Sequence, residues 1–157
     1  MALARFLCVV DTPARVTEKS EASFPKLTQY VRYSLPKVAD VPIIRSAMLE
    51  IAQLNHAKLK QALAWGNEPT LKVTPLAGAL GEFTPDIGSN EIRVDTHVVQ
   101  EFEAGRGWRN ARAGRVLLVG VTILHELTHW GDDQDGVDRP GEEGEEFERK
   151  VYGKVIN

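Results

Sequence analysis

An apolar stretch, residues 116–124, runs directly into the sequence His-Glu-Leu-Thr-His at positions 125–129, and no other feature constrains the fold of this 157-residue chain as strongly. Two histidines four residues apart lie on one face of an α-helix, one turn from each other. The stretch is too short to span a bilayer, which takes about 18 apolar residues or more. We therefore expect a buried helix over about residues 108–130, ended by Gly131 and holding both imidazoles rigidly.

The two histidines and the glutamate between them suggest hydrolytic metal chemistry. Two imidazoles plus one carboxylate give zinc three protein ligands and leave its fourth position open for water, so His125 and His129 are candidate zinc ligands. Zinc lowers the pKa of its water, and Glu126 can take a proton as that water attacks a carbonyl, then deliver it to the leaving amine. The alternative is a pair of ordinary core histidines on a packing helix.

The third ligand is expected from residues 141–148, a segment that holds five glutamates. In a helix over residues 141–155, Glu148 lies beside the apolar, core-facing stripe, where a carboxylate is costly unless it is paired or bound to metal. Glu148 is therefore the favoured ligand. Glu143 is the main alternative, because a Glu-Gly pair near a helix start can also present a ligand, and another acidic residue stays open.

We expect other roles for the neighbouring residues. Glu142 and Glu146 are expected to point to solvent, and Gly144 would let this helix approach the motif helix closely. Tyr152, one turn past Glu148, could donate a hydrogen bond to the oxyanion of the tetrahedral intermediate, or could be a half-buried aromatic at the rim of the core. Asp132 could orient His129 from behind the metal.

Composition bounds the remaining possibilities. The chain is 43% hydrophobic and 26% charged, with a net charge of -3, as in an ordinary soluble globular protein, and its scattered Lys and Arg exclude a nucleic-acid surface. We expect one domain over residues 1–157, with no signal peptide and no transmembrane segment. Residues 1–10 are expected to form an opening strand, in which Cys8 is a buried thiol without chemistry.

The rest of the pattern predicts short helices and strands. Its elements are a loop-rich region over 12–42 with one short helix around 26–33, a helix or helix pair over 43–65, strands at 70–75, 79–83 and 92–94, a short helix over 96–104, a polar loop over 132–139 and a last helix from Pro140 to about Val151.

The motif residues resemble a known group. The sequence Leu-His-Glu-Leu-Thr-His-Trp over 124–130 resembles the zincin active-site helix, and the strand at 92–94 resembles the zincin edge strand that binds substrate backbone. The eighteen residues between His129 and Glu148 resemble gluzincin spacing. Together with Gly-Glu-Glu-Gly-x-x-Phe-Glu over 141–148, residues 90–153 look like the metallopeptidase toxin domains of bacterial polymorphic toxins, some of them delivered by type VI secretion.

This resemblance implies an α+β, zincin-like domain with a small, mostly antiparallel sheet packed on the motif helix. It further implies a zinc-dependent endopeptidase that acts on a protein or peptide substrate, is secreted or delivered into a target cell as part of an effector, and has a cognate immunity protein. Two rival hypotheses are a zincin-shaped binding module that has lost turnover, against which the intact Glu126 argues, and a metal-dependent hydrolase of a non-peptide amide.

Overall fold

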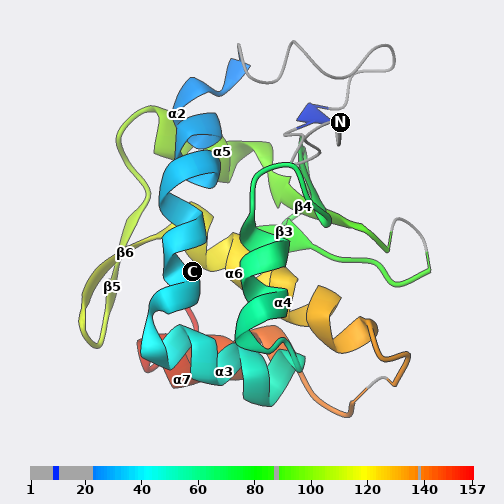
Figure 1. Ribbon diagram of the computed structural model, residues 1–157. Coiled ribbons are helices and arrows are strands. Elements are labelled where there is room, and N and C mark those ends of the chain that lie inside the picture. The colour runs from blue at the N-terminus through cyan, green and yellow to red at the C-terminus, as the bar shows by residue number, and fades with distance from the viewer. Residues whose placement is uncertain (1–8, 11–22, 87–88, 138) are drawn as a thin grey trace.

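The His-Glu-Leu-Thr-His sequence lies on α6 (Leu118–Asp133), near the centre of the computed structural model (Figure 1). The structure describes residues 9–10, 23–86, 89–137 and 139–157. Every residue of α6 is buried except His125, His129 and Asp133. Because these three follow each other at four-residue spacing, α6 leaves one stripe open and packs all its other sides.

The segment before α6 is not helical, so the prediction of a helix from about residue 108 is wrong. Strands β5 (Trp108–Ala111) and β6 (Gly114–Leu117) form an antiparallel hairpin that ends where α6 begins. Ala111 pairs with Gly114, whose φ of 130° is a backbone conformation that glycine adopts readily and other residues rarely adopt. The surrounding residues had suggested a helix, but the conformation of Gly114 favours a hairpin turn.

Three prolines expected in loops each stand in the first turn of a helix, where the missing N–H costs nothing. They are Pro25 in α2 (Pro25–Gln29), Pro36 in a 3-10 helix (Leu35–Asp40) and Pro42 in α3 (Pro42–Ala52). A π-helical segment (Tyr30–Ser34) joins the first two. The short helix predicted around residues 26–33 is therefore confirmed, and the loop-rich prediction is wrong for the described residues that follow it up to 42. The helix pair predicted next is confirmed as α3 and α4 (His56–Leu63).

A four-stranded sheet lies on one side of α6, in the order β1 (Val9–Val10), β2 (Thr70–Thr74), β4 (Glu91–Asp95), β3 (Gly81–Glu82). The first three strands are parallel and only β3 is antiparallel, so the mostly antiparallel sheet predicted from the sequence is wrong. The strand predicted at 92–94 is β4, which is interior. The edge strand beside α6 is β3, and Cys8 lies outside the described residues.

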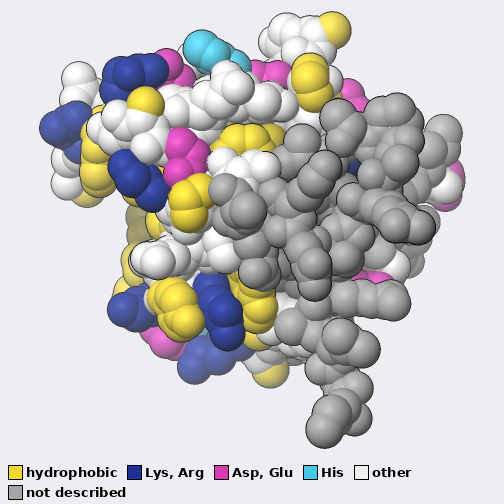
Figure 2. All heavy atoms as spheres, turned by 90° about the horizontal axis from the view of Figure 1, so that it is seen from above, with side chains coloured by type: hydrophobic (Ala, Val, Ile, Leu, Met, Phe, Trp, Pro, Cys, Tyr) yellow, Lys and Arg dark blue, Asp and Glu magenta, His cyan; other side chains and the backbone are white. Residues whose placement is uncertain are grey.

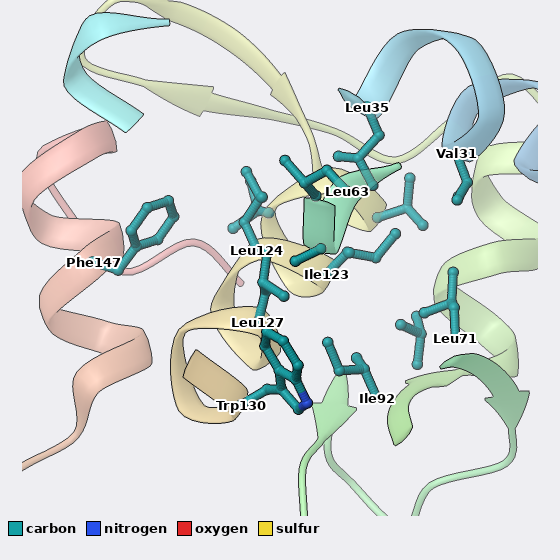
Figure 3. Packing of buried hydrophobic residues seen from close by; sticks show 14 of the residues in the cluster. Val31, Leu35, Leu63, Leu71, Ile92, Ile123, Leu124, Leu127, Trp130 and Phe147 are labelled. Carbon is teal, nitrogen blue, oxygen red and sulfur yellow. The ribbon is translucent and has the colours of Figure 1, made fainter. Parts of the chain in front are cut away.

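The core fixes α6 from several directions (Figure 3). Leu127 and Trp130 of α6 lie near Ile92 of β4, while Phe147 projects from α7 (Glu143–Tyr152). Helices α3 and α7 pack against each other and against α6, and α5 (Thr96–Glu103) also contacts α6. A fully buried Leu or Phe contributes about 1.5–3 kcal/mol, so a helix buried on all sides but one holds its open stripe rigidly.

The surface shows no segregation of charge on the face in Figure 2, where Lys and Arg, Asp and Glu, and hydrophobic side chains are interspersed among the coloured atoms. Among the described residues, no helix combines the length and the apolar character that crossing a bilayer requires.

Candidate metal centre

The two motif histidines converge on the open stripe of α6. Their Nε2 atoms are 3.3 Å apart, and the ring centroids are 5.1 Å apart. The side chains are 20% and 22% exposed, so both rings are held by packing yet reach solvent. One helical turn between His125 and His129 thus gives the convergence that the sequence predicted.

Each imidazole is oriented by a carboxylate on its other nitrogen. Glu148 Oε1 lies 2.6 Å from His125 Nδ1, and Glu143 Oε2 lies 3.1 Å from His129 Nδ1. A carboxylate can only accept, so each Nδ1 donates, and a neutral ring then turns an unprotonated Nε2 towards its partner. Burial lowers the pKa of His125, but the hydrogen bond to Glu148 and the nearby carboxylates raise it more, so the net shift is upward.

Glu142 faces both Nε2 atoms. Its Oε1 lies 2.7 Å from His129 Nε2 and 3.5 Å from His125 Nε2, and the three side chains form a group able to hold a metal ion. The expectation that Glu142 points to solvent is wrong, although its side chain is half exposed. Two nitrogen lone pairs and a carboxylate oxygen converge, a set of acceptors that a cation would satisfy, and a His₂-carboxylate set fits catalytic zinc.

Gly144 makes this convergence sterically feasible. A Cβ at this position would lie 2.3 Å from both Nε2 and Cδ2 of His125, closer than any side chain tolerates. The prediction that Gly144 allows α7 to approach the motif helix is confirmed, since α6 and α7 are in extensive contact.

Glu126 lies beside the histidines on the flank nearer the sheet. Its side chain is 6% exposed, and burial raises its pKa to about 7, helped by the neighbouring Glu142 and Glu82 and opposed by His125 and Arg93. The backbone of β3 passes directly over it, because a Cβ on Gly81 would meet Glu126 Oε1 at 2.7 Å. Gly81 was not predicted from the sequence, although a glycine inside a strand is a signal of such a close approach.

These residues line a cleft with a volume of about 740 Å³ between the open stripe of α6, the edge strand β3 and the start of α7. A second hollow of about 250 Å³ continues on the other side of Glu126. The two share Gly81, His125, Glu126 and Glu145, so His125 and Glu126 lie between them rather than at a closed end.

Two predicted residues occupy other positions. Tyr152 is in the hydrophobic core, 8% exposed, with its ring centroid 6.1 Å from that of Phe147 in an edge-to-face arrangement, and burial raises the pKa of its phenol. It is not among the described residues that line either hollow. Asp132 is buried with Oδ1 3.3 Å from Arg139 Nε, and the position behind His129 where it was expected is taken by Glu143.

Comparison with known proteins adds the family. No curated protein and no solved structure gives a significant match. The family model described as metallopeptidase toxin 3 matches residues 20–153, which extends the likeness well upstream of the region about 90–153 that the motifs suggested. The match spans α2 through α7 and includes both histidines, Glu126 and the acidic segment at the start of α7. The chain belongs to the metallopeptidase toxin 3 family.

Proposed function

We propose that this protein is a zinc-dependent endopeptidase with a zincin-like active site, in which His125, His129 and Glu142 bind the metal and Glu126 carries protons. The observation that carries the proposal is the convergence of both Nε2 atoms and Glu142 Oε1, while carboxylates hold both Nδ1 atoms. A zinc ion bound there supplies Lewis-acid chemistry, polarising a carbonyl and lowering the pKa of water. Family membership supports a metallopeptidase with a protein substrate.

The choice of Glu142 over Glu148 follows from which ring nitrogen each acid faces. Both oxygens of Glu148 are engaged, Oε1 by His125 Nδ1 and Oε2 by the backbone N–H of Ile156 at 2.6 Å. Glu143 likewise lies on Nδ1 of His129. These two acids are proposed to orient the ligands and keep their Nε2 atoms unprotonated, a role that outer carboxylates commonly have in metal sites.

Glu126 is suited to move a proton in both directions. A carboxyl group with a pKa of about 7 accepts a proton from water and returns it to a leaving amine at neutral pH with little driving force lost. Its carboxylate lies against the backbone of β3, so a peptide bond aligned on that strand would be next to Glu126 Oε1.

Strand β3 is proposed to align the substrate. It is the edge of the sheet and pairs with β4 on one side only among the described residues, which leaves backbone groups for an added strand. Hollows on both sides of Glu126 let a chain pass through the site, and this openness favours an endopeptidase over an exopeptidase.

We also propose that the protein is delivered into a bacterial target cell, by type VI secretion or another route. A cognate immunity protein is part of the same proposal.

The test replaces the proton carrier and leaves the ligands intact. Glu126→Gln should keep about one zinc per chain and abolish cleavage of an unfolded protein substrate and toxicity on expression in a target cell. His125→Ala should lose both zinc and activity. Undiminished toxicity of Glu126→Gln would overturn the peptidase proposal and favour a binding module, whereas activity on non-peptide amides alone would favour the other rival.

A further inference from the structure

The larger hollow of the cleft is lined by carboxylates and contains no lysine or arginine among its described lining residues. Its acidic lining residues, on α6, on α7 and its N-terminal flank, and on the strand and loop over 82–86, are Glu82, Asp86, Glu126, Asp132, Asp133, Glu142, Glu143 and Glu145. Their number exceeds what a metal site uses. Arginines outside the lining contact three of them, so several negative charges stay in excess even with a divalent ion bound.

The excess lies to one side of the catalytic residues. Asp133 is the third member of the open stripe of α6, one turn beyond His129 and two turns beyond His125. Asp86, exposed, lines the same hollow from the loop that follows β3. A substrate side chain just past the metal on this side would therefore meet carboxylates from two different elements.

Two carboxylates of this lining, those of Asp132 and Glu143, are almost completely buried. Glu143 Oε1 and Asp132 Oδ1 have no hydrogen-bond partner, although their residues are only 8% and 4% exposed. Both carboxylates already have partners: Asp132 forms an ion pair with Arg139, whose Nε lies 3.3 Å from Oδ1, and accepts a backbone hydrogen bond from Arg139, while Glu143 Oε2 lies 3.1 Å from His129 Nδ1. The Asp132–Arg139 ion pair is an example, next to this hollow, of a carboxylate stabilised by a guanidinium group.

The smaller hollow differs in chemistry. The apolar side chains of Leu80, Val155 and Ile156 line it beside the polar residues Thr122, His125 and Asn157, and its carboxylates are Glu126, Glu145 and Glu148. Glu148 is fully engaged by His125 and Ile156. At about 250 Å³ this hollow suits one apolar side chain of moderate size.

We propose that the cleft selects a basic side chain on the Asp86–Asp133 side of the scissile bond and an apolar side chain on the Leu80–Ile156 side. This specificity rests on the proposed peptidase function and adds the substrate class. A second metal ion is the competing occupant of the acidic side. Against it, the described residues offer no other group of three ligand side chains with the close spacing of His125, His129 and Glu142.

The test uses a synthetic peptide library in which one position on each side of every potential scissile bond is varied. Zinc-loaded protein should cleave sequences with Lys or Arg on one side about tenfold or more faster than those with Glu, and the preference should weaken as ionic strength rises. An apolar residue should be preferred on the other side.

A double variant isolates the acidic side. Asp86→Asn with Asp133→Asn removes two charges outside the ligand set and should reduce the basic preference to about threefold or less. Asn suits position 86, whose φ is 66°. The matched control is Asp135→Asn, because Asp135 is exposed and lines a separate hollow beside Trp130.

The outcomes separate this inference from the function on which it rests. Cleavage with equal rates for Lys, Arg and Glu, or a preference unchanged in the double variant, overturns the basic specificity and leaves the peptidase intact. If no peptide is cleaved, binding to zinc-loaded Glu126→Gln decides: tighter binding of a Lys/Arg peptide than of its Glu counterpart supports the acidic subsite, and equal binding overturns it. A second bound metal ion that displaces the basic peptide also overturns it.

Discussion

His125 Nδ1 and Glu148 Oε1 are 2.6 Å apart, and the second oxygen of Glu148 accepts a hydrogen bond from the backbone N–H of Ile156 at the same distance. Glu148 is 3% exposed, so this buried carboxylate links the C-terminal residues to the first histidine of the motif. The link fixes which nitrogen of His125 carries a proton and thereby which nitrogen faces Glu142.

Glu148→Ala should lower zinc affinity about 10- to 100-fold, the usual cost of removing a carboxylate that orients a ligand. Glu148→Gln keeps one acceptor oxygen but cannot accept from both His125 and Ile156, so its loss should be smaller. Zinc titration against a fluorescent chelator measures both. Complete loss of zinc in both variants would instead make Glu148 a direct ligand.

Glu142→Ala should weaken zinc binding more than either Glu143→Ala or Glu148→Ala, because only Glu142 faces both Nε2 atoms. Glu146→Ala, on the exposed face of the same helix, is the matched control and should bind zinc normally. The same titration compares all four proteins. Normal zinc affinity in Glu142→Ala would return Glu143 or Glu148 to the ligand set.

Gly144→Ala should displace His125, since the added methyl group would fall 2.3 Å from its ring. Alanine improves helix propensity by about 1 kcal/mol, but overpacking costs about 1–3 kcal/mol, so we expect a lower midpoint of thermal unfolding and weaker zinc binding. Calorimetry and zinc titration measure the two effects. A variant more stable than the wild type with normal zinc affinity would contradict the close approach of the helices.

Tyr152→Phe tests the oxyanion role that the sequence suggested. Because the ring packs against Phe147 in the core and lines neither hollow, we expect kcat to change by no more than a few-fold, well short of the about 10²–10³-fold cost of losing an oxyanion donor. Steady-state kinetics with matched zinc loading decide it. A hundredfold fall in kcat at unchanged zinc content would establish the catalytic role.

The sequence predicted what depends on local periodicity. His125 and His129 share a face because of the helical repeat, and β4 and α5 have the lengths and composition of ordinary short elements. The parallel pairing of β2 with β4 could not be predicted in this way. The spacing of residues within one strand does not show which other strand it pairs with.

Glu142 illustrates why a proposed ligand was not predicted from the sequence. The helical wheel placed it on the solvent side of a helix that was taken to start at residue 141. The helix α7 begins at Glu143, and Glu142 precedes it with φ -118° and ψ 87°, outside the helical conformation. Its side chain direction is therefore set by the turn before the helix, which periodicity cannot describe. The hairpin of β5 and β6 was missed for a related reason, since one glycine conformation decides it.

The most direct test of the central claim is an anomalous-scattering crystal structure of the zinc-loaded protein. We expect one zinc peak per chain, about 2.0–2.2 Å from Nε2 of His125, Nε2 of His129 and a carboxylate oxygen of Glu142, with Glu148 and Glu143 still on the two Nδ1 atoms. A zinc-loaded chain with no peak between the two imidazoles, or with rings turned so that their Nε2 atoms diverge, would contradict it.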